Sequence, residues 1–381
     1  MKIKNLRIKV FSCIVTISVF LSLLNGCTKV NQLHERLIVQ GIGVDVIEDG
    51  YEITLHVFDD INTGIDESEK IEVITGKGES VLDAFTNVSL KTGREPLYSQ
   101  NLILVIGLDA AKAGIENIID FFIRYYEARP GVSIFVAQSS AKSIMTSKYN
   151  DQPITAMKIS ALAGSGDINA KLLESNVVNV TNNLYGNLTD VSIMSIRSEN
   201  TNDGDNIIAD ATAVFRGDKL VGFLDDIHTR GMLLINGNIN GGTFSVDVDD
   251  KTKATLMFNK VKSYFNVITE GDNLKIISNI DVTADLYSLD SSVKTKYPGE
   301  YLEEIENVAK VKLTKECEDT INSAVMGLGS DVFNFGKITR LHEPNYFKTI
   351  DENWHSIMKE TEYEINLNVS INKIGQEMNP Y

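Results

Sequence analysis

Cysteine is scarce in this chain, and its scarcity excludes a disulfide framework. The 381 residues contain three cysteines, at Cys13, Cys27 and Cys317. Cys13 lies in an N-terminal segment that we expect to be removed, and Cys27 has another use, described below. Cys317 would then be left without a second thiol to pair with. It falls on an apolar stripe at helical spacing, so we predict a small, inert core side chain there.

Long apolar runs are also lacking, and the one near the N-terminus is too short to cross a bilayer. It extends over the 15 residues from Val10 to Leu24, whereas a spanning helix needs about 20. The basic residues Lys2, Lys4, Arg7 and Lys9 precede it, and no acidic residue does. A basic start followed by a short apolar run is typical of a secretory signal peptide, which we place at residues 1–26.

The residues that end this segment have the form of a bacterial lipobox. Leu24-Asn25-Gly26-Cys27 offers an apolar residue three positions before the cysteine and a small residue directly before it. We predict cleavage between Gly26 and Cys27 and transfer of a diacylglyceryl group to the nucleophilic Cys27 thiolate. Two acyl chains would hold the protein on a membrane almost permanently. The alternative is a plain signal peptide followed by a chance cysteine.

Positive charge is in short supply, which disfavours nucleic acid as a partner. The formal net charge is −16, and removal of the four basic residues of the signal segment takes it to −20. Such a surface is repelled by phosphate backbones and by anionic lipid headgroups. Membrane attachment must therefore come from the predicted lipid rather than from a basic patch. With 43% hydrophobic and 23% charged residues, the chain has the composition of a globular protein.

Residue patterns for metal binding or catalysis are missing as well. None of the five histidines has metal-ligand spacing, and Pro344 would break a zinc helix beginning at His342. Half of a dinucleotide-binding fingerprint is present at Gly41-Ile42-Gly43. The spacing of a phosphate-binding loop is missing at Gly76-Lys77-Gly78, which we predict to be a turn before a helix cap. No G-x-S-x-G elbow is present. We therefore expect no metal, no cofactor and no enzymatic activity. We predict that His56 lies on the polar face of its strand and is solvated.

The apolar periodicities predict an α+β protein with mixed α/β layers. In the first half, a helix capped by Ser80, a strand at 102–106 buried on both faces and a helix capped by Asp109 imply strand–helix–strand layers. The second half is largely antiparallel. Its predicted elements are a hairpin at 213–223, strands at 255–268 and 274–286, a helix at about 300–326, a helix carrying Trp354 in the core, and a closing strand at 363–371.

The polar stretch 198–206 contains no apolar side chain and is predicted to be a linker. It would separate an N-terminal domain at 27–197 from a C-terminal domain at 207–381, which has room for two subdomains. Each subdomain is expected to contain a β-sheet packed by helices.

Several sequence blocks together resemble the Ger(x)C family, the lipoprotein subunits of spore germinant receptors. The resemblance runs over nearly the whole processed chain. The blocks are Val39-Gln40-Gly41-Ile42-Gly43-Val44-Asp45, Thr75-Gly76-Lys77-Gly78-Glu79-Ser80, Arg124 with Glu127 and Arg129, Ala213–Phe215 with Lys219–Asp225, Thr229-Arg230-Gly231, Asp331-Val332-Phe333-Asn334-Phe335-Gly336, and Asn353-Trp354. Departures from the family pattern are Thr28 and Lys29 directly after Cys27, Gln100 and His228.

The resemblance implies a non-enzymatic receptor subunit on the outer leaflet of the spore inner membrane. It implies assembly with two membrane-embedded companions, the A and B subunits, and a response to small nutrients. Candidates for partner contact are Arg124, Glu127 and Arg129 in one block and Thr229 and Arg230 in another, since a guanidinium can make bidentate or stacked contacts. For the first block, a local ion pair between Arg124 and Glu127 is an equal alternative.

Two other classes of protein remain as hypotheses. One is a free-standing solute-binding lipoprotein that serves a transporter, which we would expect to have two similar α/β lobes. The other is an extracytoplasmic hydrolase, which lacks support because the sequence contains no catalytic constellation.

Overall fold

The computed structural model describes residues 36–58, 71–124, 131–186, 188–271, 273–291 and 302–374, together with Phe11 and Thr16. The chain divides at Leu37 into two units, and the second unit runs to Tyr381. The predicted cleavage and acylation positions, Gly26 and Cys27, lie outside the described residues. So do two candidates for partner contact, Glu127 and Arg129.

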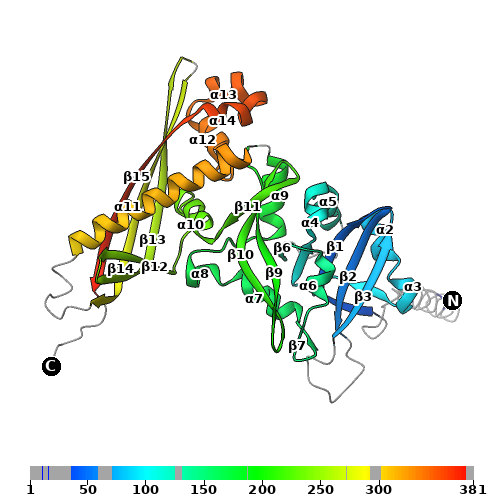
Figure 1. Cartoon of the computed structure of the whole chain (residues 1–381). Coiled ribbons are helices and arrows are strands. Elements are labelled where there is room, and N and C mark those ends of the chain that lie inside the picture. The colour runs from blue at the N-terminus through cyan, green and yellow to red at the C-terminus, as the bar shows by residue number, and fades with distance from the viewer. Residues whose placement is uncertain are drawn as a thin grey trace, which may run out of the picture. The chain divides into compact units, whose positions relative to one another are not determined.

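An eleven-stranded sheet dominates the first part of the chain (Figure 1). Its strands are β1 Arg36–Ile47, β2 Gly50–Phe58, β3 Ile71–Gly78, β4 Glu95–Leu97, β5 Ile103–Ile106, β6 Ser133–Ala137, β7 Lys148–Tyr149, β8 Gln152–Pro153, β9 Ser192–Thr201, β10 Gly204–Arg216 and β11 Lys219–Asp225. The order is β3-β2-β1-β5-β6-β9-β10-β7-β8, with β4 paired to β1 and β11 to β10. The pairs β1–β5, β5–β6 and β6–β9 are parallel, and antiparallel hairpins flank them.

Helices cover both faces of this sheet. They are α2 Val81–Thr86, α3 Ser89–Thr92, α4 Leu108–Ala113, α5 Glu116–Arg124, α6 Ala141–Met145, α7 Ala156–Ala163, α8 Gly166–Asn169 and α9 Val177–Gly186. Side chains of β5 alternate between two buried clusters: Leu104 and Ile106 pack with α2, α4, α5 and α9, while Ile103 and Val105 pack with α6 and α7. All four are fully buried, which confirms the prediction of a strand covered on both sides.

One of the two predicted helix starts is confirmed and the other is wrong. Ser80 caps α2, since its Oγ accepts a hydrogen bond from the N–H of Asp83 at 3.1 Å. Asp109 was expected to cap one helix, but the structure has two: α4 starts after Gly107, and the chain turns at Gly114 with a φ of 131° before α5 begins. Only glycine adopts that backbone conformation readily, so Gly114 separates the two helices.

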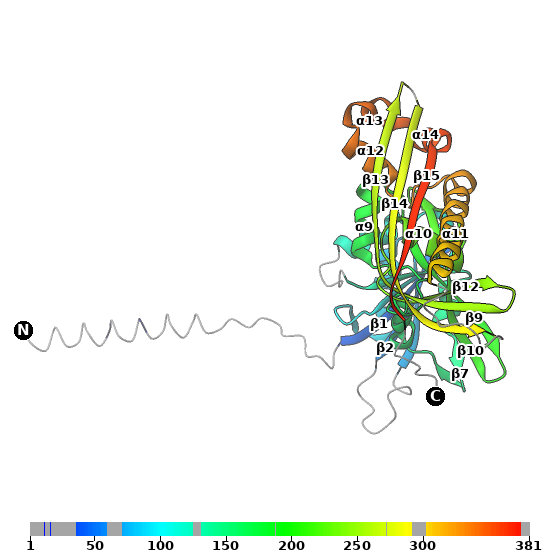
Figure 2. The same cartoon turned by 90° about the vertical axis from the view of Figure 1, so that its left-hand side faces the viewer.

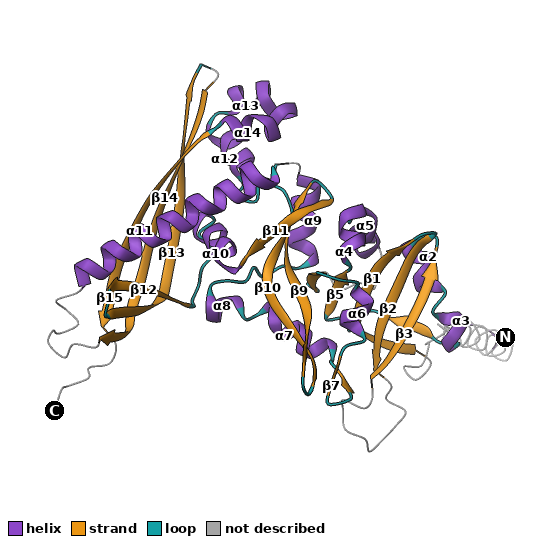
Figure 3. Cartoon of the chain, in the orientation of Figure 1, coloured by secondary structure: helices purple, strands orange, loops and turns teal. Residues whose placement is uncertain are grey.

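The second half builds a four-stranded sheet. Its strands are β12 Thr243–Asp249, β13 Thr252–Glu270, β14 Asn273–Ser291 and β15 Glu362–Ile374. The pairs β12–β13 and β13–β14 are antiparallel, whereas β15 joins β14 in parallel. The long helix α11 Leu302–Ile321 lies along one side of this sheet (Figure 2). The shorter α10 Asp226–Ile235 packs beside α11 (Figure 3). Together with the mixed first sheet, this arrangement confirms the predicted α+β class.

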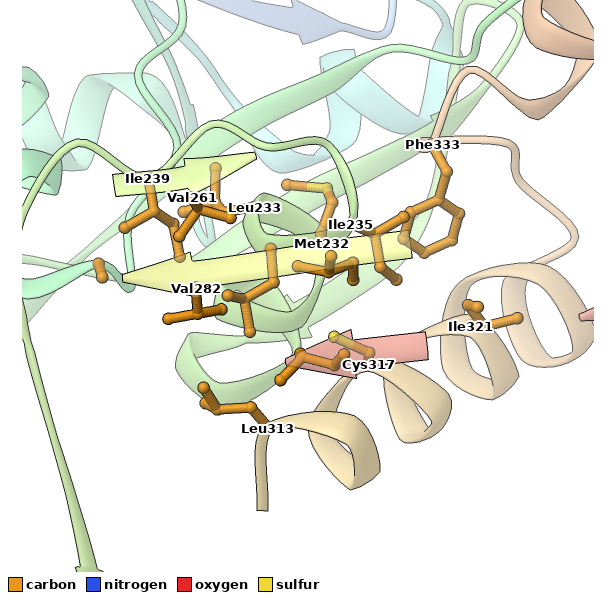
Figure 4. Packing of buried hydrophobic residues seen from close by; sticks show 14 of the residues in the cluster. Met232, Leu233, Ile235, Ile239, Val261, Val282, Leu313, Cys317, Ile321 and Phe333 are labelled. Carbon is orange, nitrogen blue, oxygen red and sulfur yellow. The ribbon is translucent and has the colours of Figure 1, made fainter. Parts of the chain in front are cut away.

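The core of the second half lies between the sheet and these two helices (Figure 4). Met232 of α10, Val282 of β14 and Leu313 of α11 meet there, and Cys317 is fully buried beside them. The prediction for Cys317 is therefore confirmed. Burial also raises the pKa of its thiol, because a thiolate would lose its hydration.

The remaining helical segments follow α11. They are a π-helical turn Asn322–Leu328, α12 Phe335–His342, α13 Pro344–Ile350, a 3₁₀ turn Asp351–Asn353 and α14 Trp354–Glu360. Trp354 is 6% exposed, as its predicted core position requires.

The expected linker at 198–206 lies within strands rather than in an irregular connection. These residues form the end of the β9–β10 hairpin, with Gly204 paired to Thr201 and Ile207 to Ser198. The predicted hairpin around 213–223 is β10–β11, and both strands belong to the first sheet. The first sheet therefore includes strands on both sides of 198–206, and a division into 27–197 and 207–381 stays a prediction.

Gly76 and Gly78 were predicted to lie in a turn. They are instead among the last three residues of β3, and α2 packs directly against them. A Cβ atom on Gly76 would overlap the carbonyl oxygen of Ala84, and one on Gly78 would overlap the backbone nitrogen of Ala84. Glycine at these positions lets the helix backbone approach the strand.

Replacing Gly76 with alanine should therefore destabilise the protein. The added methyl group meets helix backbone rather than a flexible side chain, so Gly76→Ala should lower the free energy of unfolding by about 1–3 kcal/mol, as overpacking does. Urea unfolding followed by circular dichroism measures this. Gly131→Ala is the matched control because its Cβ would meet nothing within 4 Å. Equal unfolding midpoints for the two variants would contradict the close contact.

Candidate functional site

Arg230 forms a buried ion pair inside the chain. It lies on α10, and its Nε and Nη2 donate to the two carboxylate oxygens of Glu316 on α11 at 2.8 and 2.7 Å. The side chains are 3% and 8% exposed. The geometry is the bidentate one that a guanidinium offers to a carboxylate. The expectation that Arg230 makes this contact with a partner is wrong, because Glu316 already occupies the guanidinium.

The residues on either side of Arg230 are also used in internal packing. Thr229 is fully buried, and its hydroxyl lies 2.9 Å from that of Thr212 on β10. A Cβ on Gly231 would overlap the Thr320 hydroxyl of α11. The Thr229-Arg230-Gly231 block therefore joins α10 to β10 on one side and to α11 on the other. Thr229, like Arg230, presents no surface to a partner.

Arg124 is the one candidate for partner contact that the structure places on the surface. It ends α5, and its Nε donates to Asp120 at 2.6 Å. The side chain is 78% exposed. A local ion pair therefore forms with Asp120, one turn earlier in α5, while the alternative pair with Glu127 involves a residue outside the described ranges. Hydrogen bonding by Asp120 raises the pKa of Arg124.

A buried carboxylate, Asp331, organises the segment that leads into α12. One of its oxygens accepts the N–H groups of Phe333 and Phe335, at 3.3 and 3.0 Å. The other accepts the N–H of Gly336 at 2.7 Å and Trp354 Nε1–H at 3.0 Å. A Cβ on Gly336 would come within 2.9 Å of Trp354 Nε1. The Asp331–Gly336 block and the Asn353-Trp354 block thus meet at one carboxylate.

A second acid, Asp190, links this segment to the first sheet. Its N–H donates to the Asp331 carbonyl at 2.9 Å, and its Oδ2 accepts the Asp331 N–H at 2.7 Å. Its other oxygen accepts the N–H of Gly217, in the β10–β11 turn, at 3.1 Å. His355 Nε2 lies 2.9 Å from Oδ2. These contacts join residues that are far apart in the sequence. We call the group the acid cluster; its members are Asp190, Asp331, Trp354 and His355.

The electrostatics of the acid cluster follow from burial and hydrogen bonding. Burial raises the pKa of Asp331 to about 6, against the effect of the N–H groups that it accepts. Burial acts in the same direction on Asp190, but the hydrogen bond and charge of His355 and the N–H donors outweigh it, so the pKa of Asp190 is lowered. The hydrogen bond to Asp190 raises the pKa of His355.

The acid cluster borders a small cavity, but its groups are committed to one another. The cavity measures about 150 Å³ and is lined by Asn183, Leu184, Leu188, Thr189, Gly217 and the four cluster residues. A histidine–aspartate pair could act as a general base if a nucleophile stood within reach. Thr189 is the hydroxyl that lines the cavity, and it donates to Asn334 at 2.8 Å instead. The arrangement therefore holds the fold.

The first sequence block has a similar structural role. Both oxygens of Asp45, at the end of the Gly41–Asp45 stretch, accept hydrogen bonds from the N–H groups of Ala141 and Lys142, at 2.7 and 2.8 Å. They cap the start of α6. The expectation for His56 on the neighbouring strand is wrong: it is fully buried, and its Nε2 lies 2.5 Å from the Met145 carbonyl. Its pKa is lowered by burial, since α6 covers the strand face that was predicted to be wet.

Sequence reasoning found the blocks but missed the residues that join them. Asp331 and Trp354 stood in noted blocks, while Asp190, His355 and Glu316 carried no local signal. Each contacts a group that lies more than 80 residues away in the sequence. A lone acid within a helical or loop pattern is usually solvated, so no spacing rule could have found these three.

Within the ranges that the structure covers, no three His, Cys, Asp or Glu side chains are grouped so as to hold a metal ion. In the same ranges, no helix has the length and apolar character needed to cross a membrane.

Two family models match the chain side by side. One, described as the spore germination protein N-terminal domain, covers residues 29–198. The other, described as spore germination B3/GerAC like, C-terminal, covers residues 210–375.

Individual proteins agree with these matches. Spore germination protein B3 of Bacillus subtilis (strain 168) is 23% identical over 362 residues, which cover 92% of this chain and 94% of that protein. The putative spore germination protein YfkR of the same strain is 18% identical, over 96% of this chain and 97% of that protein. The crystal structure of the GerBC protein superposes with a TM-score of 0.58 at 19% identity, covering 87% and 96% of the two chains. That last likeness shows the fold.

The Arg230–Glu316 pair gives a first prediction from this site. Arg230→Met leaves the Glu316 carboxylate buried without its partner, so the free energy of unfolding should fall by about 3–5 kcal/mol. The double variant Arg230→Met/Glu316→Leu removes both charges and should recover most of the loss. Chemical denaturation measures both.

Arg124→Met is the control for that experiment, because it removes a guanidinium from an exposed ion pair and should leave the unfolding midpoint unchanged. A double variant no more stable than Arg230→Met alone would show that the uncompensated charge is not the cause.

The acid cluster gives a second prediction, on pH. Folding raises the pKa of His355, so the stabilisation it contributes is present below about pH 6.5, the pKa of an unfolded histidine, and is lost as the pH rises through the raised value. His355→Gln should therefore flatten the decline of stability above that pH, as read from urea unfolding at a series of pH values. His342→Gln, on the exposed end of α12, should keep the wild-type profile. A decline of the same size in His355→Gln would mean that another group titrates.

Proposed function

The chain belongs to the Ger(x)C family of spore germination proteins, and from this we propose that it is the lipid-anchored, non-enzymatic C subunit of a germinant receptor complex. The observation that carries the proposal is the pair of adjacent family matches, which together extend from residue 29 to residue 375. A chain that follows the family over both halves is expected to share the family's role in triggering germination.

The lipid anchor is proposed from the N-terminal sequence. Leu24-Asn25-Gly26-Cys27 directly follows a signal-like apolar run, and the N-terminal family match begins at residue 29, two residues after the cysteine. Cleavage before Cys27 and acylation of its thiol would place the whole matched region outside the cytoplasm, on the outer leaflet of the spore inner membrane.

A non-enzymatic role agrees with how the charged groups are used. Arg230 and Glu316 neutralise one another, and the oxygens of Asp331 accept four N–H donors. Groups held in this way build a firm body that can transmit force or occupy a place in an assembly. The companions that we propose are the membrane-embedded A and B subunits of the receptor, which would sense the nutrient.

The alternative of a free-standing solute-binding lipoprotein is less well supported. Such proteins close two similar lobes around a ligand, whereas this chain pairs a mixed eleven-stranded sheet with a four-stranded one. No feature of the structure favours that alternative over a receptor subunit.

Replacing the acylated cysteine tests the anchor and the role together. Cys27→Ala removes the thiol that would take the lipid, so the protein should move from the membrane to the soluble fraction after centrifugation. Nutrient-triggered germination of the spores should fall to the level of a deletion of the gene. Cys317→Ala, which changes a buried thiol, is the control and should leave the protein on the membrane.

Two results would contradict the proposal. Cys27→Ala protein that still sediments with membranes and supports normal germination would remove the anchor. Unchanged germination of the deletion strain with every nutrient, in a strain without related genes, would remove the receptor role.

A further inference from the structure

An apolar groove opens on the outer side of α2 and α3. Its volume is about 470 Å³, and its walls include Leu82 and Phe85 of α2, Pro96 and Tyr98 at β4, and Phe121 of α5. The rings of Phe85 and Phe121 stack with their centroids 4.5 Å apart, and Tyr98 meets Phe85 edge-on at 5.0 Å. The aromatic base is firmly packed, so the groove is a fixed feature of the surface.

Large apolar side chains project into solvent around this groove. Leu82 on the rim is 54% exposed, and Leu90 on α3, next to the groove residue Ser89, is 81% exposed. Single exposed leucines are ordinary, but two leucines at or beside the lining of one groove extend its apolar surface. Between residues 77 and 94 the acids Glu79 and Asp83 are outnumbered by Lys77, Lys91 and Arg94, so this segment is not acidic although the chain as a whole is.

The groove lies beside the point where the chain enters the fold. β4 pairs with β1, and Leu102, a few residues after β4, donates its N–H to the Gln40 carbonyl. Because β5 occupies the later part of β1, from Gly41 to Val44, β4 must flank the start of that strand. Leu37 follows Cys27 by ten positions, and a chain of that length reaches at most about 35 Å.

We propose that the groove, with Leu82 and Leu90, rests in the interface of the lipid bilayer next to the anchor. The proposal rests on the lipid anchor proposed above, which would keep this face within reach of the membrane. Headgroup charge cannot hold a chain of net charge −20, so contact must come from apolar side chains that enter the acyl boundary. The two contacts together would restrict how the body is oriented above the membrane.

Fluorescence quenching by brominated phospholipids tests the contact. The processed chain, beginning at Cys27, is coupled through that thiol to a maleimide lipid in protein-free vesicles of zwitterionic and anionic phospholipid. Cys317 is fully buried and stays unlabelled. Leu90→Trp should be quenched, since its indole would lie among the brominated chains. Leu341→Trp, which replaces a leucine of similar exposure, 77%, on α12, should not be. Trp354 is buried and contributes the same background to both.

A second variant removes the apolar contact while keeping the tether. Leu82→Asp/Leu90→Asp alters two exposed side chains, so the fold should persist. Thr86→Trp places the indole at an exposed position in the lining of the groove, and its quenching should be lost in that background. Leu82→Asp/Leu90→Asp should also weaken the binding of vesicles by the chain that is not coupled to lipid. The loss of one buried leucine corresponds to roughly tenfold in affinity, so the double variant should bind at least tenfold more weakly.

Equal quenching of Leu90→Trp and Leu341→Trp would overturn the proposal. So would protection of Leu90→Trp from solvent only when membrane proteins are added, because the groove would then bind a protein. Because the chain is coupled chemically, the quenching results do not depend on acylation in the cell. The fractionation of Cys27→Ala therefore tests the lipid anchor, and the quenching of Leu90→Trp tests the bilayer contact.

Discussion

The reciprocal bonding of Asp190 and Asp331 is the constraint on which the arrangement of the two sheets depends. Each backbone N–H finds an oxygen of the other residue, and together they connect the segment before β9 to the segment before α12. Burying two carboxylates is costly unless every oxygen has a donor. Here the donors come from Phe335, Gly336, Gly217 and the Trp354 and His355 side chains. Burial nevertheless raises the pKa of Asp331 to about 6.

The blocks that identify the family are, in this chain, the places where elements are locked together. Asp45 caps α6 across the sheet, Gly76 admits the backbone of α2, and Arg230 binds α10 to α11. In each case a group that could contact water contacts another part of the protein instead. The residues that these blocks share with the family therefore maintain the body of the protein.

The firm interior contrasts with the apolar surface around α2 and α3. Aromatic rings pack there to form the floor of an open groove, and two leucine side chains are exposed beside it. Pro96 and Tyr98 of the groove lie at β4, which pairs with β1, the first strand after the proposed anchor in the sequence. A body tethered at one point can rotate freely, while a second contact limits rotation. Such a restriction would help a subunit meet companions embedded in the membrane.

Local patterns in the sequence determined the α+β class, the buried strand β5, the Ser80 cap, the β10–β11 hairpin and the core positions of Cys317 and Trp354, because each depends on periodicity or on neighbours within a few residues. Tertiary structure decided the rest. The alternation along its strand predicts that His56 is solvated, but α6 covers it. The polar stretch 198–206 predicts a linker, but its residues pair as strands. Arg230 was predicted to contact a partner, but it binds Glu316, 86 residues away. Which side chain meets which depends on how distant elements close on one another, and that closure is governed by packing and by the need to pair every buried charge, neither of which leaves a spacing in the sequence.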